Sequence, residues 1–453
     1  MFDVVVLGGG PGGYIAAIKA GRAGFKTALV EQDSLGGTCL NRGCIPTKYF
    51  LHVAEIFHAF EKNDIGLKAD NIKYDIATMY EKKNAVVEKL IGGIEKLLEN
   101  AGVEVFKGHG VLKSKTSLLV DDKELEFKNL IIATGSSVFK PPIEGIESAY
   151  TSDDILSKNP INFESVIIIG GGVIGVEFAT VYAKLGKSVT IIELEKTILP
   201  PFDRDIAMQQ ALCLKKMGVK IINGAKVTNI KKNGCTYELK EKVENIEADA
   251  VIVSIGRIAN TADMGFETIG LEFDKRGIIT DEYLKTNIEG IFAIGDVVKG
   301  NVMLAHNAEN QGCLVVDNLK KDKKEKRLTI IPSCVYSTPE IASVGVSEKE
   351  AEAKNINIKI GKVPMGSNGK SLLSGSETGF IKVIFDEEDR LIGCNMMCLS
   401  ATDMIGGIST LVTNKVKREE ILHSMYPHPT VVEAFFQAVE DVEKASTCMV
   451  YKK

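Results

Sequence analysis

The chain of 453 residues is 45% hydrophobic and 25% charged, and its net charge is -5. A single hydrophobic core stops growing at about 250–300 residues, so a chain of this length is expected to divide into several domains. The acidic balance offers no attraction to nucleic acid or to anionic membranes. No apolar run reaches the ~18 residues that span a bilayer, and Met1 leads directly into an apolar strand, which predicts a cytoplasmic protein.

The chain begins with a strand and a glycine-rich turn that return later. The sequence VVVLGGGPGG starts at Val4, and the related VIIIGGGVIG starts at Val166. In each copy a second apolar strand ends in a glutamate, Glu31 or Glu193, which lies 23 positions after the first glycine. One such glycine pattern is weak evidence, but two with the same context predict two dinucleotide sites. The glycines let the backbone approach a pyrophosphate, and the carboxylate accepts hydrogen bonds from ribose hydroxyls.

The stretch GGTCLNRGCIPTK at 36–48 carries Cys39 and Cys44, two of the nine cysteines. Placed in a loop that enters a helix, they can close a small strained disulfide, which is the reducible kind. The alternatives are half of a zinc site and two unrelated buried thiols. A zinc site would need further soft ligands nearby, and the sequence offers none, so we predict no metal. An odd number of cysteines in a long cytosolic chain also argues against a structural disulfide scaffold.

Further along, residues 73–102 have the periodicity of a long amphipathic helix. Lys128–Gly135 has the pattern of a buried strand that ends in a glycine turn, and Ala250–Arg257 and Gly290–Asp296 repeat it. We expect the carboxyl ends of these strands to meet a ligand. From about Ile330 strands alternate with helices and no dinucleotide signature remains. Strands are expected there at Ile358–Val363, Gly379–Phe385 and Leu391–Met397.

These features resemble the class I pyridine nucleotide-disulfide oxidoreductases over the whole chain, and among them the dihydrolipoamide dehydrogenases most closely. The stretch at 36–48 is similar to the redox-active motif of that family. The two glycine repeats are similar to its FAD and NAD(P) fingerprints, Ile294-Gly295-Asp296 to its second FAD motif, and HPTVVE at 428–433 to a motif of its interface domain.

The resemblance implies an α/β fold with two Rossmann-like dinucleotide-binding domains, for FAD and NAD, and a C-terminal α+β dimerisation domain. The implied boundaries are 1–147 and 269–332 for the two parts of the FAD domain, 148–268 for the NAD domain and 333–453 for the interface domain. It also implies a homodimer, FAD and NAD as cofactors, and a lipoyl-bearing carrier domain or protein as partner.

By the same resemblance, Cys44 is the thiol beside the flavin and Cys39 exchanges with the substrate. Lys48 is expected to pair with Glu177 beside flavin N5; the alternative is a surface lysine and an ordinary helix glutamate. His428 is the implied acid–base residue, because an imidazole with a pKa near ~6.5 can take a proton from a thiol with a pKa near ~8.5. Glu433 would orient that ring.

Further residues are expected to bind the two cofactors. They are Gly8, Gly10, Gly13, Glu31, Thr38, Lys48, Gly110, Thr134, Gly135, Ser136, Asp296, Met303, Leu304, Ala305, His306, Gly170, Gly172, Val173, Gly175, Glu193, Val227 and Gly256.

The chain departs from the family pattern at two places. The loop between Asp296 and Met303 is one residue longer than usual and has Asn301-Val302 where a proline is expected. Before His428 the chain has Met425-Tyr426-Pro427, where many of these dehydrogenases have another histidine, a difference that bears on substrate affinity.

The leading interpretation is oxidation of a protein-bound dihydrolipoyl group by NAD, through the Cys39–Cys44 disulfide and the flavin. The sequence leaves open whether that group belongs to a 2-oxoacid dehydrogenase, acetoin or glycine cleavage system. One alternative is an NAD(P)H-dependent reductase of glutathione or another small disulfide. A flavoprotein that only binds or scaffolds its partners is disfavoured, because every element of the redox relay is present.

Overall fold

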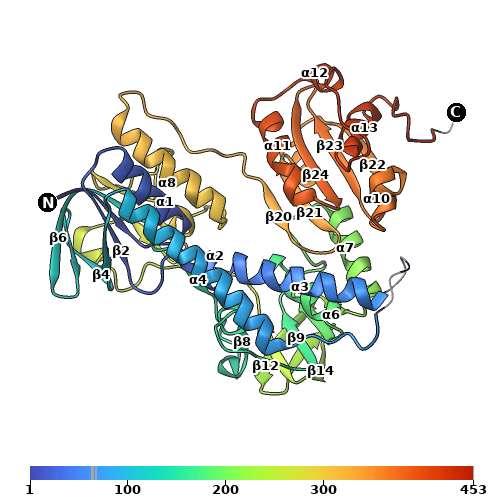
Figure 1. Ribbon diagram of the computed structural model, residues 1–453, viewed down its shortest axis with the longest axis horizontal. Helices are drawn as coiled ribbons and strands as arrows, with labels where there is room; N and C mark the ends of the chain where they lie inside the picture. Colours follow the sequence, from blue (N-terminus) through green and yellow to red (C-terminus); the bar gives the residue numbers. More distant parts are fainter. Residues whose placement is uncertain (63–65, 67–68, 452–453) are drawn as a thin grey trace. The chain divides into compact units, whose positions relative to one another are not determined.

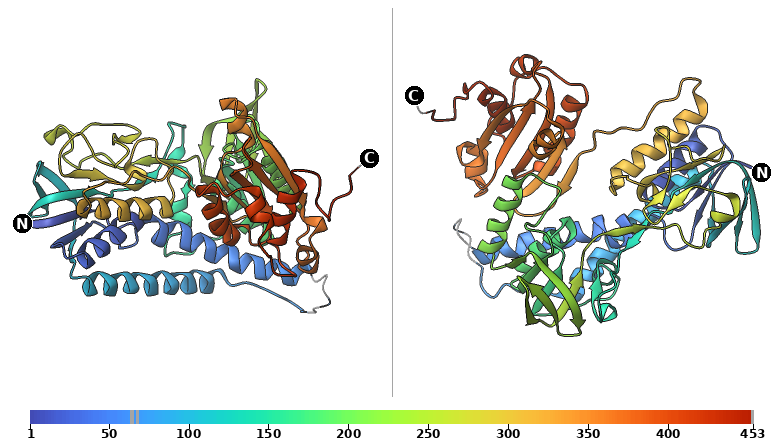
Figure 2. Two further views of the ribbon diagram at one scale, coloured as in Figure 1. Left: turned by 90° about the horizontal axis from the view of Figure 1, so that it is seen from above. Right: turned by 180° about the vertical axis from the view of Figure 1, so that it is seen from behind.

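The computed structural model describes residues 1–62, 66 and 69–451, which form two compact units (Figures 1 and 2). The first unit comprises Met1–Pro142, Tyr150–Asn162 and Ile255–Leu328. The second comprises Ile143–Ala149, Phe163–Ser254 and Thr329–Lys453. The division into FAD, NAD and interface domains is finer than these two units and stays a prediction.

The first unit is built on a mixed sheet with the strand order β3-β2-β1-β6-β5-β4, in which β19 also pairs with β6. Its strands are β1 (Phe2–Leu7), β2 (Thr27–Glu31), β3 (Glu104–Lys107), β4 (Gly110–Ser114), β5 (Ser117–Val120), β6 (Lys123–Ile132) and β19 (Ile291–Ala293). Strands β1, β2, β3, β6 and β19 are parallel neighbours. Along β1, Val5 and Leu7 belong to one apolar core, whereas Val4 and Val6 belong to another. Both faces of this sheet are therefore covered, as parallel sheets require.

Helices and short elements complete the first unit. They are α1 (Pro11–Arg22), α2 (Gly37–Arg42), α3 (Cys44–Lys62), α4 (Ile76–Asn100), α5 (Ser152–Ile155), α8 (Ala305–Lys320), η2 (Glu267–Ile269), η3 (Gly295–Val297) and the strands β7 (Ser136–Val138), β8 (Tyr150–Thr151), β16 (Arg257–Ala259), β17 (Phe273–Asp274) and β18 (Gly277–Ile278). The long helix predicted at 73–102 is confirmed as α4. It begins where it does because the carboxylate of Asp75 accepts a hydrogen bond from Ala77 N at 2.9 Å.

Helices α1 and α8 lie side by side (Figure 1). They can do so because both carry a glycine at the crossing: a Cβ atom on Gly312 would lie 2.6 Å from the carbonyl oxygen of Gly12. Lys19 and Asp317 form an ion pair of 2.6 Å between the same two helices. The helix that follows the second FAD-type motif thereby packs on the helix that follows the first glycine turn, although 298 positions separate Lys19 from Asp317 in sequence.

The second unit begins with a parallel sheet in the order β11-β10-β9-β15. Its elements are β9 (Ser165–Ile169), α6 (Val173–Lys184), β10 (Ser188–Glu193), α7 (Arg204–Lys216), β11 (Lys220–Asn223), the antiparallel strands β12 (Ala225–Lys231), β13 (Gly234–Leu239) and β14 (Lys242–Glu247), then β15 (Ala250–Val253), with the short turn η1 (Ile146–Ser148). The order strand, glycine turn, helix, strand is the same as at the start of the chain. The sequence repeat is therefore a structural repeat.

The C-terminal part of this unit is an antiparallel sheet in the order β20-β21-β24-β23-β22. Its elements are β20 (Ser333–Val335), β21 (Glu340–Gly345), α9 (Glu348–Lys354), β22 (Lys359–Pro364), η4 (Met365–Ser367), α10 (Gly369–Leu373), β23 (Phe380–Phe385), β24 (Leu391–Cys398), α11 (Ala401–Thr413), α12 (Arg418–Leu422) and α13 (Glu433–Asp441). The three strands predicted here are confirmed, each within one residue at either end. Ile381, Val383 and Phe385 share one apolar core with residues of α11 and α13.

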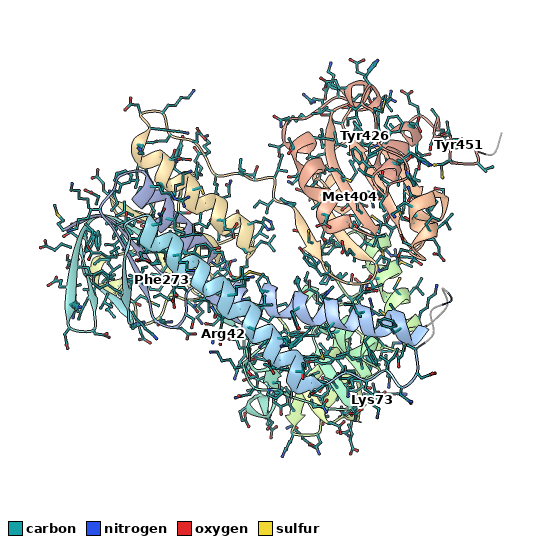
Figure 3. All side chains as sticks on the ribbon, viewed as in Figure 1. Arg42, Lys73, Phe273, Met404, Tyr426 and Tyr451 are labelled. Atoms are coloured by element: carbon teal, nitrogen blue, oxygen red, sulfur yellow. A yellow bond between two sulfur atoms is a disulfide. The ribbon has the colours of Figure 1, made fainter. Side chains whose placement is uncertain are left out.

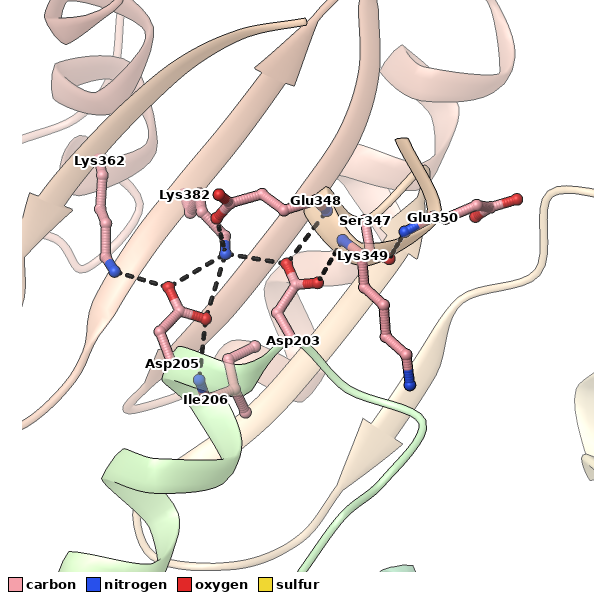
Figure 4. Close-up of polar contacts among 9 residues, drawn as sticks. All are labelled: Asp203, Asp205, Ile206, Ser347, Glu348, Lys349, Glu350, Lys362 and Lys382. Atoms are coloured by element: carbon pink, nitrogen blue, oxygen red, sulfur yellow. Dashed lines mark hydrogen bonds and ion pairs between the residues drawn. The ribbon is translucent and has the colours of Figure 1, made fainter. Parts of the chain in front are cut away.

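Because side chains alternate along a strand, Lys382 points to the opposite face of this sheet, where it meets helix α7 (Figure 4). Its ammonium nitrogen lies 2.8 Å from Asp203 Oδ2 and 3.0 Å from Asp205 Oδ2, and it also contacts Glu348. Lys382 is 1% exposed and Asp203 is 3% exposed. In the described part of the chain these three carboxylates form the group with metal-ligand spacing, and the lysine ammonium already provides their positive charge.

Within the described residues, every helix is too short or too polar to traverse a lipid bilayer.

Candidate active site

Cys39 and Cys44 form a disulfide whose Cα atoms are 4.7 Å apart. The sequence predicted a loop that enters a helix, and this was wrong in part: Cys39 lies within the short helix α2, and Cys44 is the first residue of α3. Gly43 separates the two helices, and a Cβ atom there would lie 2.9 Å from the carbonyl oxygen of Thr38. Only glycine permits this close return of the backbone, which brings the two sulfur atoms together.

The segment around the disulfide is fixed by local hydrogen bonds. Asn41 donates to the carbonyl oxygens of Leu35 and Gly37 at 3.0 and 2.9 Å. The hydroxyl of Thr47 donates to the carbonyl oxygen of Gly43 at 2.7 Å. Such bonds hold α2 and the start of α3 in one geometry, so the pair is preorganised for disulfide exchange.

The first glycine turn fits a pyrophosphate. Gly8 directly follows β1 and has φ +107°, and a Cβ atom there would lie 2.3 Å from the carbonyl oxygen of Ala133. A Cβ atom on Gly13 would lie 1.8 Å from the carbonyl oxygen of Gly8, while Gly10 is the residue that precedes α1. Glu31, at the end of β2, accepts a hydrogen bond from Gly9 N at 2.6 Å. The backbone at the helix N-terminus is thus open to an anion, with an acid beside it.

The second turn repeats this geometry in the second unit. Gly170 has φ +103°, and a Cβ atom on Gly175 would lie 2.0 Å from its carbonyl oxygen. Gly172 precedes α6, and Val173 is the first residue of that helix. The two carboxylate oxygens of Glu193 accept from Gly171 N at 2.5 Å and from Glu195 N at 2.7 Å.

A polar network joins the disulfide helix to the second FAD-type motif. The hydroxyl of Ser136 donates to Asp296 Oδ2 at 2.6 Å. Burial raises the pKa of Asp296 above its ordinary value, although the Ser136 hydroxyl and the charge of Arg257 oppose the rise. Arg257 donates to the hydroxyl of Ser136 at 2.8 Å, to its carbonyl oxygen at 2.6 Å and to the hydroxyl of Thr38 at 3.3 Å. Thr38 directly precedes Cys39, so this network reaches the redox pair.

Arg257 is a site residue that the sequence interpretation missed. The signal for it was present, because it directly follows Gly256, which was predicted to bind a cofactor and has φ +122°. Asn260 was missed as well. It donates to the carbonyl oxygen of Thr134 at 2.9 Å and accepts, at its own carbonyl, from the hydroxyl of Thr134 at 2.9 Å. It therefore fixes the turn that continues into Gly135.

The remaining predicted cofactor residues lie at several places. Met303 and Leu304 precede α8, and Ala305 and His306 begin it. Gly110 begins β4, and a Cβ atom there would lie 2.5 Å from Leu7 Cδ1, at the carboxyl end of β1. Val227, on β12, is buried in the apolar core of the second unit, so any contact it makes with a cofactor comes from its main chain.

His428 and Glu433 lie together, as predicted from the sequence. His428 Nδ1 and Glu433 Oε1 are 2.9 Å apart, and Glu433 Oε2 accepts from Thr430 N at 2.8 Å. Partial burial opposes ionisation of Glu433, but the Thr430 N–H and His428 outweigh it and lower the pKa of this carboxyl. An ionised Glu433 accepts the proton on Nδ1, which leaves Nε2 of His428 as the proton acceptor. The His428 side chain is 79% exposed in the single chain.

Tyr426, in the segment where the chain departs from the family, packs against α13 (Figure 3). Its ring centroid lies 5.3 Å from that of Phe436 and 6.3 Å from that of Phe435. The aromatic contacts hold the loop that carries His428 to the helix that carries Glu433.

Lys48 and Glu177 lie in different units. Lys48 is on α3, in the first turns after Cys44. Glu177 is on α6, is 4% exposed and accepts a hydrogen bond from Tyr336 N at 3.0 Å. The pairing of these two residues stays a prediction, as does the approach of His428 to the disulfide.

The disulfide, the two glycine turns and the histidine–glutamate pair define a dinucleotide-dependent disulfide oxidoreductase. The family described as pyridine nucleotide-disulphide oxidoreductase matches residues 2–312, and its dimerisation domain matches residues 331–439. The chain belongs to this family. FAD and NAD, the predicted cofactors, are those of the family, and the matched dimerisation domain supports a homodimer.

Individual relatives are similar over almost the full length. Dihydrolipoyl dehydrogenases from Zymomonas mobilis and Bacillus subtilis are each 36% identical to this chain, over 97% of the chain and 97% and 96% of those proteins. The structure of the HOCl-induced flavoprotein disulfide reductase RclA from Escherichia coli has a TM-score of 0.86 and 27% identity, and the match covers 98% of this chain and 99% of that one. The predicted fold class is thereby confirmed.

Proposed function

We propose that this chain oxidises a protein-bound dihydrolipoyl group to the lipoyl disulfide and reduces NAD to NADH. The observation that carries the proposal is the reducible Cys39–Cys44 disulfide at a cofactor cradle, in a chain 36% identical to dihydrolipoyl dehydrogenases over 97% of its length. The partner is a lipoyl-bearing carrier domain or protein. The cytoplasmic location inferred from the sequence remains part of this proposal.

The two cysteines, His428 and Glu433 each have a separate role in the reaction. Nε2 of His428 takes a proton from one thiol of the substrate, whose thiolate attacks the sulfur of Cys39 and releases Cys44 as a thiolate. The second substrate thiol then attacks the mixed disulfide, so the substrate leaves as a cyclic disulfide and Cys39 leaves as a thiol that carries the remaining proton. When bound, FAD supplies the two-electron relay from this dithiol to NAD. Glu433 holds the His428 ring in the required tautomer and stabilises its charged form.

One assay separates this function from reduction of glutathione or another small disulfide. Rates are measured with dihydrolipoamide and NAD, and with glutathione disulfide and NADH or NADPH. Faster turnover of dihydrolipoamide by several orders of magnitude is expected. Comparable or faster turnover of glutathione disulfide would overturn the proposal. Flavin binding without turnover of either substrate would favour a binding role.

Glu193 predicts a preference for NAD over NADP. Both of its carboxylate oxygens are held by backbone N–H groups, so the acid is fixed where it can accept from a ribose 2'-hydroxyl and repel a 2'-phosphate. The neighbouring Leu194 is 65% exposed and offers a place for an arginine. Glu193→Ala combined with Leu194→Arg should lower kcat/KM for NAD and raise it for NADP. Equal efficiency with both cofactors in the unmodified protein would contradict the prediction.

The two cysteines are predicted to differ in their spectra. Cys39→Ser leaves Cys44 as a thiol with no disulfide partner, and its thiolate beside the flavin should give long-wavelength charge-transfer absorbance without added reductant. Cys44→Ser should lack this band. The visible spectra of the two purified variants decide the matter, and identical spectra would show that the roles of the two cysteines are assigned wrongly.

A further inference from the structure

Three amide side chains form hydrogen bonds with one another where the loop after β19 meets α8: Asn301 from the loop, and Asn307 and Gln311 from the helix. The Asn301 amide nitrogen donates to Gln311 Oε1 at 3.0 Å, and the Gln311 amide nitrogen donates back to Asn301 Oδ1 at 3.0 Å. The Asn307 amide nitrogen donates to the same Asn301 Oδ1 at 3.0 Å. Asn307 is 4% exposed and Gln311 is 1% exposed. We call these three residues the amide clamp.

The clamp binds the main chain directly before each of the two groups of predicted flavin contacts, Asp296 and Met303–His306. Gly295 N donates to Gln311 Oε1 at 2.8 Å, and Asn301 donates to the carbonyl oxygen of Gly295 at 2.8 Å. Gly295 has φ +72° and directly precedes Asp296. At the other end of the loop, Asn307 donates to the carbonyl oxygen of Val302 at 3.0 Å, and Val302 directly precedes Met303.

The chemistry of the clamp requires neutral amides. Each of the three side chains donates through its amide nitrogen and accepts through its amide oxygen; for Asn307 the accepted bond comes from the Gln311 amide nitrogen at 3.3 Å. A carboxylate in place of an amide would lose the donor and set an anionic oxygen against a carbonyl oxygen in a buried place, which costs more than a lost hydrogen bond. The family pattern led us to expect a proline where Asn301-Val302 stands, and a proline has no side-chain donor. This chain therefore holds its longer loop with side-chain amides.

We propose that Asn301, Asn307 and Gln311 are positioning residues for FAD. By fixing Gly295 they set the direction of Asp296, whose carboxylate is already held by Ser136 on the other side. By fixing Val302 they set the start of α8. The affinity and the reduction potential of the bound flavin both follow from this geometry. The inference rests on the proposed function only in taking Asp296 as a flavin contact.

The test uses an isosteric substitution, Asn301→Asp, and a matched control on the same segment, Asn310→Asp. Asn310 is exposed on α8 and lies outside the clamp. Full-length protein is stripped of FAD and titrated with FAD, and binding is followed by flavin fluorescence. The reduction potential and the visible spectrum of each reconstituted protein are then recorded. Far-UV circular dichroism and the melting temperature of the FAD-free protein report folding.

Asn301→Asp is expected to weaken FAD binding by about tenfold or more, because it loses two donated bonds and gains a repulsive contact. Its flavin spectrum and reduction potential should shift, whereas Asn310→Asp should bind FAD within about twofold of the unmodified protein. Asn301→Ala, which removes the two bonds without adding charge, should give a smaller loss in the same direction. It serves as the test if Asn301→Asp does not fold.

Unchanged FAD affinity and potential in a folded Asn301 variant would overturn the proposal, even if the melting temperature falls, because the clamp would then be structural only. The outcome is independent of the substrate. If the unmodified protein does not oxidise dihydrolipoamide but the Asn301 variants bind FAD more weakly, the proposed function is wrong and the role of the clamp is supported. If the unmodified protein is an active dehydrogenase but its Asn301 variants bind FAD normally, the role of the clamp is wrong and the proposed function is supported.

Discussion

Replacing His428 with alanine is expected to lower the rate of dihydrolipoamide oxidation by about 10²- to 10⁴-fold, the range that a positioned acid–base residue contributes. The reason lies in the fixed tautomer: Glu433 binds Nδ1 at 2.9 Å, so Nε2 is the atom that accepts the substrate proton. Steady-state rates at neutral pH measure the effect. His423 provides the control. Among the hydrogen bonds described, its ring contacts only a main-chain oxygen, Glu419 O, at 2.8 Å. His423→Ala should retain activity within about twofold.

The same variant tests whether the active site is shared between subunits. His428 lies in the matched dimerisation domain, whereas Cys44 lies in the N-terminal part of the chain. His428 is 79% exposed in the single chain, as a residue would be that completes the site of a partner subunit. Each two-fold dimer would then contain two composite sites.

Inactive Cys44→Ser and His428→Ala chains, unfolded and refolded together, should recover about a quarter of wild-type activity, because about half of the dimers are mixed and each has one intact site of its two. Each variant refolded by itself is the control. Mixed dimers without recovered activity would place His428 in the same subunit as its disulfide.

Replacing Lys382 with methionine is expected to destabilise the second unit by about 3–5 kcal/mol, because it leaves Asp203, Asp205 and Glu348 without the buried cation they share. The urea midpoint followed by circular dichroism measures the loss. The control is Lys359→Met on the neighbouring strand β22, where the lysine is 45% exposed and pairs with Asp389 at 2.8 Å. An exposed pair of this kind contributes at most about 1 kcal/mol.

The pH dependence gives this prediction a second readout. Burial lowers the pKa of Lys382, but hydrogen bonds to Asp203 and Glu348 outweigh it and leave the pKa raised. Its contribution is therefore complete below the ordinary lysine value of ~10.4 and is lost as the pH rises through the higher folded value. Burial raises the pKa of Asp205, but the hydrogen bonds and positive charges of Lys362 and Lys382 outweigh it and leave this pKa lowered. Its contribution is present above ~3.9 and is lost as the pH falls through the lower folded value.

Both contributions are present at neutral pH in the unmodified protein. In Lys382→Met the buried cation that helps to lower the pKa of Asp205 is absent and the neighbouring carboxylates oppose its ionisation, so the variant no longer gains the stability that ionised Asp205 provides as the pH rises. The loss of stability relative to the unmodified protein should accordingly be larger at pH 7 than at pH 5. Equal losses at the two pH values, or a loss no greater than that of Lys359→Met, would show that the cluster does not act through these charges.

The sequence by itself determined the elements whose signals are local. The two strand–glycine–helix repeats, the long helix expected at 73–102 and found at 76–100, and three of the five strands of the C-terminal sheet were predicted, because glycine turns and apolar periodicity act within a few positions. Strands β20 and β21 of that sheet were not predicted. The acids Glu31 and Glu193 were found because each repeat carries one at the same spacing. The disulfide and the His428–Glu433 pair were also predicted, since their partners lie five positions apart in each case.

The tertiary structure alone decided which distant residues meet. Arg257 reaches Thr38 and Ser136, and Lys382 reaches Asp203 and Asp205, across separations that no sequence periodicity spans. The amide clamp spans few positions in sequence, but its function depends on the left-handed Gly295, whose N–H and carbonyl oxygen bind the side chains of Gln311 and Asn301. Sequence patterns report which face of an element is apolar. They do not report which buried polar groups will be hydrogen-bond partners, because that depends on how the strands and helices pack. A buried polar group needs a hydrogen-bond partner, and the packing of the fold determines which residue supplies it.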